Sequence, residues 1–249
     1  MKTVAAIQVR LNSTRLPGKV MMEVLGKPLL GHLLMRLRQS KYLDEIAVST
    51  SESPIDDPIV SFCARNNTPC FRGSEEDVLG RMLGCLTSRK ANIGVVVYGD
   101  CPLIDPSIVD TMISEFCADD SLDFLGNDLK TTYPPGMDVE VFRLEALLDS
   151  ARRTDNPETR EHGTLYIRLN PEIYRIRNIE APECFRRPDL LLGLDTPEDL
   201  EVITAIFEHF GQDISFGLAE IIEFLDAHPE LKARNQQVFR RWRQYRQDN

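Results

Sequence analysis

Cationic and hydroxyl side chains gather near the start of the chain, in the segment QVRLNSTRLPGK at residues 8–19. Arg15 offers a planar fork of N–H donors that suits phosphate oxygens, and Lys19 offers a compact point charge. Ser13 and Thr14 add hydroxyl donors, and a Pro-Gly turn brings Lys19 back toward Arg15. Two cations and several donors on one loop favour a polyphosphate as the ligand. The glycine patterns of Walker A and dinucleotide-binding loops are absent from it, so a chance basic loop is the alternative.

Two aspartates stand at the ends of apolar runs farther along the chain. Asp100 ends the run IGVVVYGD at 93–100, and Asp195 follows the run LLLGL at 190–194. A carboxylate at the end of a buried strand is costly to leave unpaired, so each aspartate is a candidate ligand for Mg²⁺. The alternative is a helix cap, which the residues alone favour for Asp195. Asp105 fits the cap role best, because a proline follows it.

The elements that must position these side chains alternate over the first half of the chain. Strands followed by helices predict a mostly parallel sheet that is covered on both faces. In such sheets ligands bind at the carboxyl ends of the strands, which is where the opening loop and Asp100 fall. The predicted strands span 3–9, 44–50, 68–73 and 93–100, and the predicted helices span 28–40, 56–67, 74–90 and 105–118.

Residues 121–182 break this alternation, and we interpret them as a lobe inserted into a single domain of residues 1–210. After the lobe we expect a strand at 190–194 and a helix that starts at the Asp-Thr-Pro sequence of residues 195–197 and ends near residue 210. The tail, 211–249, carries two helical patterns and ends in the basic segment RRWRQYR, which we expect to be a solvated helix. Within the lobe the patterns predict strands in 121–127, 134–142 and 172–180, and helices at 144–153 and 157–171.

The composition is that of an ordinary globular protein. The 249 residues are 42% hydrophobic and carry a net charge of −10, which disfavours general binding to nucleic acid or to an anionic membrane. The apolar run at the N-terminus is too short for a signal peptide, and no run is long enough to span a membrane, so we expect a cytoplasmic protein. The six cysteines form no C-x-x-C pair, which favours reduced structural thiols.

The segment IQVRLNSTRLPGKVMMEVLGKPLL resembles the N-terminal signature of cytidylyltransferases that activate sugar acids. The resemblance is strongest to the spore coat polysaccharide biosynthesis group, which is related to CMP-Kdo and CMP-sialic acid synthetases. It covers roughly residues 3–205, because FRGSEEDVLGR, GDCPLIDP, YPPGMDVEVF, REH and DTPEDLE follow in the group's order. It implies a nucleotide-diphospho-sugar transferase fold of the Rossmann-like, GT-A type. That fold is an α/β mixed sheet with helices on both faces and a small inserted lobe for sugar binding and dimerisation.

The resemblance assigns roles to the residues singled out above. It implies that Asp100 and Asp195 hold Mg²⁺ and that Arg15 and Lys19 hold phosphates, and these four form the expected catalytic set. The segment FRGSEEDVLGR is implied to hold the cytosine and ribose. Tyr98 departs from the pattern, because relatives carry Gln or a small hydroxyl residue there. The expected nucleotide-binding residues are Val9, Arg10, Ser13, Arg15, Lys19, Gly73, Ser74, Asp77, Arg81 and Tyr98.

Candidate residues for the acceptor lie in the inserted lobe. Strand alternation puts Asp138 and Glu140 on the same face. Arg160 is the candidate for binding a carboxylate of the acceptor. His162 is a candidate for orienting or deprotonating the attacking hydroxyl, with Glu161 to fix its tautomer. A structural role is the alternative for the histidine.

These features together predict transfer of CMP from CTP to the anomeric hydroxyl of a sugar acid of the nonulosonic or octulosonic type, with release of pyrophosphate. The expected cofactor is Mg²⁺, and the expected partners are CTP, a small sugar acid and a second copy of the chain. One alternative is a glycosyltransferase of the same fold that uses a nucleotide sugar, although GDCP stands where those enzymes carry Asp-x-Asp. Others are a different acceptor such as a phosphonate, a different nucleotide such as UTP, and a non-catalytic nucleotide-binding protein.

Overall fold

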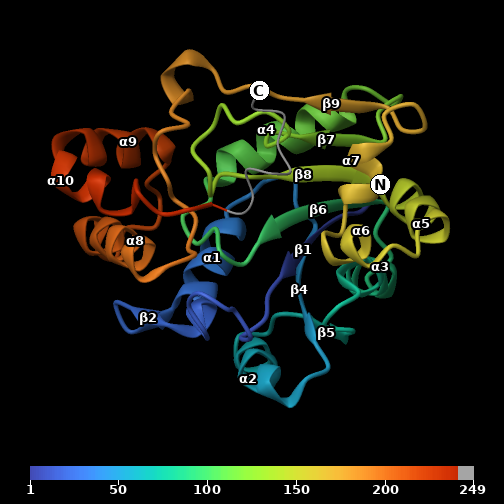
Figure 1. The fold of residues 1–249 in the computed structure, drawn as a ribbon, viewed down its shortest axis with the longest axis horizontal. Coiled ribbons are helices and arrows are strands. Elements are labelled where there is room, and N and C mark those ends of the chain that lie inside the picture. Colours follow the sequence, from blue (N-terminus) through green and yellow to red (C-terminus); the bar gives the residue numbers. More distant parts are fainter. Residues whose placement is uncertain (241–249) are drawn as a thin grey trace.

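A computed structural model describes residues 1–240 and contains one large sheet (Figure 1). Its seven strands follow the order β5-β4-β1-β6-β8-β7-β9. The first four are parallel, β8 is antiparallel to both β6 and β7, and β9 is parallel to β7. The strands are β1 (Thr3–Gln8), β4 (Glu45–Ser51), β5 (Cys70–Gly73), β6 (Ile93–Tyr98), β7 (Phe124–Gly126), β8 (Glu140–Arg143) and β9 (Ile176–Asn178), and β2 (Glu23–Val24) pairs separately with β3 (Lys27–Pro28).

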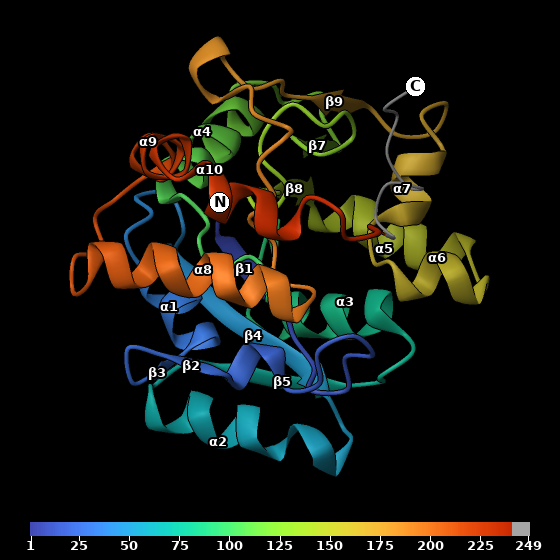
Figure 2. The ribbon, with the colours of Figure 1, turned by 60° about the vertical axis from the view of Figure 1, so that its left-hand side comes forward.

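Helices cover both faces of this sheet, which confirms the predicted α/β architecture. In Figure 1, α8, α9 and α10 lie to the left of the strands, and α3, α5 and α6 lie to the right. Figure 2 shows α8 in front of the sheet and α2 below it. The helices are α1 (Leu29–Leu37), α2 (Asp57–Arg65), α3 (Val78–Ser88), α4 (Pro106–Cys117), α5 (Leu144–Arg153), α6 (Pro157–Glu161), α7 (Leu165–Leu169), α8 (Pro197–Phe210), α9 (Leu218–Ala227) and α10 (Pro229–Lys232).

The alternating residues of β1 separate the core into two layers. Ala5 and Ile7 pack with side chains of α1, α4, α8 and α9. Val4 and Ala6 face the other way, toward α3, α5 and α7. Because successive strand residues point to opposite faces, an apolar run such as TVAAI is buried on both sides.

Two predicted elements are wrong in the structure. Residues 190–194 form no strand. Their backbone N–H groups make only isolated bonds, from Leu190 to the Arg187 carbonyl, from Leu192 to the Pro135 carbonyl and from Leu194 to the Asp100 carbonyl. The helix predicted over 157–171 is two short helices, α6 and α7. Gly163 interrupts it with a φ of 58°, a left-handed conformation that favours glycine.

The predicted lobe shares the main sheet. Its strands β7, β8 and β9 continue the sheet beyond β6, and its helices α5 and α7 pack on the same layer as α3. The division into a domain and a lobe stays a prediction. All six cysteines are free thiols. Within residues 1–240, every helix is too short or too polar to span a membrane.

The C-terminal tail begins as predicted, with α9 and α10, and continues into the short 3₁₀ turn η4 (Ala233–Asn235). Most of the segment RRWRQYR lies outside the described residues. Its first residue, Arg240, is described, and it is buried with 3% of its surface exposed. The expectation of a solvated side chain is therefore wrong for Arg240, because a carboxylate of α8 pairs with it.

Candidate active site

The central strands β1 and β6 bring two loops to one edge of the sheet. They run parallel and in register, so that Gln8 lies beside Tyr98 at the carboxyl end of the pair. The loop that begins at Val9 and the turn that begins at Gly99 therefore leave the sheet side by side, joined by a bond of 3.0 Å from Gly99 N to the Gln8 carbonyl. This is the edge at which parallel sheets bind ligands.

Four predicted catalytic residues meet at this edge. The Lys19 ammonium lies 3.1 Å from an oxygen of Asp100 and 3.0 Å from an oxygen of Asp195. Arg15 donates to the other oxygen of Asp195 at 2.9 Å. Burial of Lys19 disfavours its charge, but Asp100 and Asp195 outweigh that cost and raise its pKa. The cluster thus holds two cations against two carboxylates.

Asp195 reaches the cluster because another residue caps α8. Thr196 is the N-cap of this helix and forms a capping box with Asp199. The Asp199 carboxylate also accepts from the backbone N of Asp195 at 2.9 Å. The side chain of Asp195 is therefore turned to Arg15 and Lys19. Asp105 caps α4, as predicted, by accepting from Ser107 N.

A cleft of about 360 Å³ extends from this cluster along the sheet edge. Beside the cluster its wall includes Glu161 and His162 of the predicted acceptor set. It also includes Thr14, which the sequence analysis named as a hydroxyl donor, and four residues to which that analysis gave no role, Gln8, Val20, Val78 and Gly99. The predicted nucleotide residues that line it are Val9, Arg10, Ser13, Arg15, Lys19, Arg81 and Tyr98.

The other predicted nucleotide residues, Gly73, Ser74 and Asp77, lie behind Arg81. Arg81 donates to the Ser74 carbonyl at 2.7 Å and to the side-chain oxygen of Gln8 at 3.3 Å. Asp77 caps α3, and its backbone N donates to the Ser74 hydroxyl. Gly73 leaves room for the Arg81 side chain, because a Cβ there would lie 3.0 Å from it. Ser74 therefore binds the Arg81 guanidinium, Gly73 leaves space for the side chain, and Asp77 caps the helix that carries it.

The side chains of His162 and Tyr98 in the cleft wall also have shifted pKa values. Burial lowers the pKa of His162, which favours the neutral imidazole. Burial, followed by the charge of Glu140, raises the pKa of Tyr98. Tyr98 therefore presents a neutral phenol to the cleft.

Two further members of the predicted acceptor set lie away from the cleft wall. Arg160 pairs with Asp77 at 2.7 Å and also donates to the Thr154 carbonyl. Glu140 is 1% exposed and accepts from the Thr164 hydroxyl at 2.7 Å. Arg160 joins α6 to the start of α3, and Glu140 joins β8 to the start of α7.

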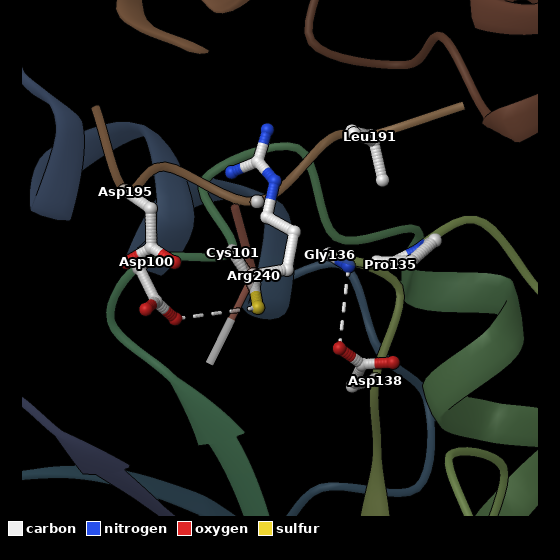
Figure 3. Close-up of a pocket in the computed structure, with 9 residues that line it drawn as sticks. Asp100, Cys101, Pro135, Gly136, Asp138, Leu191, Asp195 and Arg240 are labelled. Carbon is white, nitrogen blue, oxygen red and sulfur yellow. Dashed lines mark hydrogen bonds between the residues drawn. The ribbon is translucent and has the colours of Figure 1, made fainter. Parts of the chain in front are cut away.

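Asp138, the last of the predicted acceptor residues, lines a second and smaller pocket of about 50 Å³ (Figure 3). Asp100 and Asp195 lie on one side of this pocket and Asp138 on the other, with the Arg240 side chain between them. The pocket shares Asp100 and Asp195 with the cleft, so the two hollows meet at the cluster. Gly136 forms part of its wall with a φ of 106°, and a Cβ there would lie 2.5 Å from Gly193 N.

Sequence reasoning missed Cys101, Gly136 and Arg240 in this second pocket. Cys101 directly follows Asp100, and Gly136 lies two residues before Asp138, so adjacency to an assigned residue was an available signal. Arg240 had no such signal, because tertiary contacts alone bring it to the site.

Comparisons with known proteins identify the family of this chain. Residues 4–225 match the cytidylyltransferase family. The chain is 35% identical to the spore coat polysaccharide biosynthesis protein SpsF of Bacillus subtilis (strain 168) over 230 residues, which are 90% of this chain and 94% of that protein. It superposes on the structure of a cytidylyltransferase from Leptospira borgpetersenii with a TM-score of 0.90 and 32% identity, covering 96% of this chain and 100% of that one.

A more distant structure has the same fold. CMP:2-keto-3-deoxy-manno-octonic acid synthetase, solved with CTP, superposes with a TM-score of 0.64 and 21% identity, covering 84% of this chain and 99% of that one. The predicted nucleotide-diphospho-sugar transferase fold is thereby confirmed. The chain belongs to the cytidylyltransferase family.

Proposed function

We propose that this protein transfers CMP from CTP to the anomeric hydroxyl of a nonulosonic or octulosonic sugar acid and releases pyrophosphate. Membership of the cytidylyltransferase family supports the nucleotide and the reaction. The names of a spore coat polysaccharide protein and of a CMP-octonic acid synthetase among its relatives support a sugar acid as acceptor. The observation that carries the proposal is the meeting of Arg15, Lys19, Asp100 and Asp195 at one sheet edge.

In this proposal the cleft holds CTP with its triphosphate at the cluster. Arg15 and Lys19 exchange their aspartate partners for phosphate oxygens, which are the ligands that a guanidinium and an ammonium bind well. The base and ribose extend toward Arg81 and Tyr98 along the cleft wall. Gly73, Ser74 and Asp77 act through Arg81, whose guanidinium binds the Ser74 carbonyl and whose helix Asp77 caps.

Asp100 and Asp195 fit the Mg²⁺ that we propose as cofactor. Their carboxylate oxygens are the donors that Mg²⁺ prefers, and it is commonly held by one or two carboxylates together with substrate phosphates. Within residues 1–240, no group of three or more His, Cys, Asp and Glu side chains is arranged to hold a metal ion. Phosphates and water would therefore complete the shell, and the ion would offset the negative charge on the phosphates.

The acceptor enters from the second pocket in this proposal, because that pocket meets the cleft at Asp100 and Asp195. Its hydroxyl oxygen forms a bond to the α-phosphorus while the bond to pyrophosphate breaks, and Arg15 and Lys19 stabilise the departing charge. Positioning supplies most of the catalysis in such transfers. Asp138 faces the acceptor, and Glu161 and the neutral His162 stand at the cleft to orient it or to take its proton.

The homodimer and the cytoplasmic location predicted from the sequence remain part of the proposal.

The test is a pyrophosphate-release assay with CTP, and with UTP as the comparison, against a panel of nonulosonic and octulosonic acids. We expect release with CTP and at least one acid, and loss of release in a Lys19→Ala variant that still folds. Release of a nucleoside diphosphate from a nucleotide sugar would favour a glycosyltransferase instead. Release with a phosphonate and with none of the acids would keep the nucleotide assignment and overturn the acceptor class. Near-normal turnover of Lys19→Ala would overturn the role of that residue.

A further inference from the structure

The second pocket contains one cation that comes from the end of the described chain. Arg240 enters it between Asp138 and the Asp100–Asp195 pair (Figure 3). Among the described residues that line the pocket, Arg240 alone is positively charged. The side chain is 2% exposed, so it is part of the pocket wall and not a solvated surface group.

The Arg240 guanidinium is held in a fixed orientation. Its two terminal nitrogens donate to the Asp199 carboxylate at 2.8 and 2.7 Å. One of them also donates to the Asn235 carbonyl at 3.2 Å. Asp199 is itself fixed, because it belongs to the capping box of α8. The pair is buried on both sides, with Asp199 at 0% exposure.

The remaining edge of the guanidinium carries the Nε–H donor. This nitrogen is buried and has no hydrogen-bond partner among residues 1–240. A buried donor without an acceptor costs free energy, and native proteins seldom keep one without a reason. An oxygen of a bound molecule in the pocket would satisfy it.

The chemistry of the proposed acceptor specifies that oxygen. In a 2-keto sugar acid, the carbon that bears the anomeric hydroxyl also bears the carboxylate. If the hydroxyl reacts beside Asp100 and Asp195, the carboxylate must lie within two bonds of that carbon, in or beside the second pocket. A charge-assisted bond from a guanidinium N–H to a carboxylate is stronger than a bond to a neutral hydroxyl.

We therefore propose that Arg240 recognises the acceptor, and that its Nε–H donates to the carboxylate of the sugar acid. This inference rests on the proposed function and adds a specificity residue to it. The adjacent Phe239 carbonyl accepts from Arg15 at 3.3 Å, so the same short segment contacts the cation that we assign to the triphosphate. The C-terminal segment 235–240 thus reaches both the nucleotide side and the acceptor side of the site.

The variant that tests this proposal is Arg240→Lys, because lysine keeps the charge opposite Asp199 and removes the Nε donor. Arg234→Lys is the matched control, since Arg234 directly precedes this segment, is exposed and does not line the pocket. Thermal unfolding of both variants checks that the fold is retained.

The ligands are 3-deoxy-manno-octulosonate, N-acetylneuraminate, legionaminate and pseudaminate. Each is titrated calorimetrically into protein alone and into protein saturated with Mg²⁺ and the α,β-methylene analogue of CTP, which resists transfer.

We expect at least one acid to bind the wild type, and Arg240→Lys to weaken that binding about tenfold or more. Binding of the CTP analogue should be unchanged in both variants, and Arg234→Lys should bind the acid as the wild type does. Equal acid binding by Arg240→Lys, or a wild type that binds the analogue and none of the acids, would overturn the role of Arg240. Failure of the wild type to bind the analogue would count against the proposed function. Acid titrations into protein alone would then still decide the role of Arg240.

Discussion

At the scale of single residues, the position of Lys19 decides how a divalent ion can reach the two aspartates. Its ammonium bridges Asp100 and Asp195 at 3.1 and 3.0 Å, so it faces the same carboxylate oxygens that the ion would need. Two cations this close repel each other strongly in a partly buried site. We therefore expect that a divalent ion binds only when a triphosphate draws Lys19 away. In a Lys19→Met variant, Mn²⁺ alone should bind about tenfold or more tightly than to the wild type, measured from the EPR signal of free Mn²⁺.

Lys41→Met is the matched control for this measurement, because Lys41 is exposed and lies outside the cleft. It should bind Mn²⁺ as weakly as the wild type does. A second control, Lys19→Met combined with Asp195→Asn, should lose the gained binding. Equal Mn²⁺ binding by the wild type and Lys19→Met, in the absence of nucleotide, would mean that Lys19 does not block the site.

A site residue could be predicted from the sequence where its neighbours in the chain indicated its position in the fold. Lys19 and Asp100 were predictable, because each follows a strand and parallel strands end at the same edge. Asp195 was ambiguous, since its motif suits a helix cap equally well, and only the structure assigns the cap to Thr196. Arg240 carried no signal, because its partner on α8 lies 41 residues earlier and no local pattern links the two.

At the scale of elements, one buried ion network joins β8 to α7. Glu140 of β8 accepts from Thr164, which is the N-cap of α7, and from Arg168 of α7 at 3.1 Å. Arg168 also donates to Asp128 at 3.0 Å. Burial, and then the charge of Asp128, raises the pKa of Glu140 to about 7. The folded state therefore binds this proton more tightly than the unfolded state does.

The raised pKa of Glu140 makes the stability of the folded protein depend on pH. A carboxyl whose pKa is raised on folding contributes most to stability at low pH, and that contribution is lost as pH rises from about 4.5 to about 7. Glu140→Gln removes the ionisation, so the variant should match the wild type near pH 5. At pH 8.5 the variant should be more stable by about 1–3 kcal/mol. Urea unfolding at the two pH values measures both differences.

The exposed Glu172 provides the comparison, because Glu172→Gln should leave the difference between the two pH values unchanged. If the stability difference between Glu140→Gln and the wild type is the same at both pH values, then Glu140 does not titrate in this range in the folded protein.

The helices that were predicted well are those whose starts are marked by capping residues and prolines in the sequence. The helices α4 and α8 begin at prolines behind capping residues, and both were predicted close to their observed starts. The strand predicted at 190–194 failed, because a short apolar run can be buried without a ladder of backbone bonds. The helix predicted over 157–171 failed at Gly163, whose conformation an apolar pattern does not reveal.

At the scale of the whole molecule, alternating strands and helices predicted an α/β sheet. The resemblance to cytidylyltransferases predicted that the fold is of the nucleotide-diphospho-sugar transferase type. The alternation could not specify that β8 would enter antiparallel beside β6, or that β7 and β9 would extend the same sheet. Those pairings join residues far apart in the chain, and the pattern within one strand does not contain them. The site also joins residues that are far apart in the chain, because Arg15 and Asp195 are 180 residues apart.

A ligand that contacts residues far apart in the chain, such as Arg15 and Asp195, should stabilise the entire fold. If Mg²⁺ and CTP bind the cluster together, a concentration of 100 times the dissociation constant adds about 2.7 kcal/mol to the free energy of unfolding. For a chain of 249 residues, that gain should raise the melting temperature by roughly 5–11 °C, as measured by differential scanning fluorimetry. Mg²⁺ alone should raise it little, because Lys19 already neutralises the two aspartates. The same rise with Mg²⁺ alone would show that the ion does not need the nucleotide, and no rise with both would count against CTP as the ligand of this cleft.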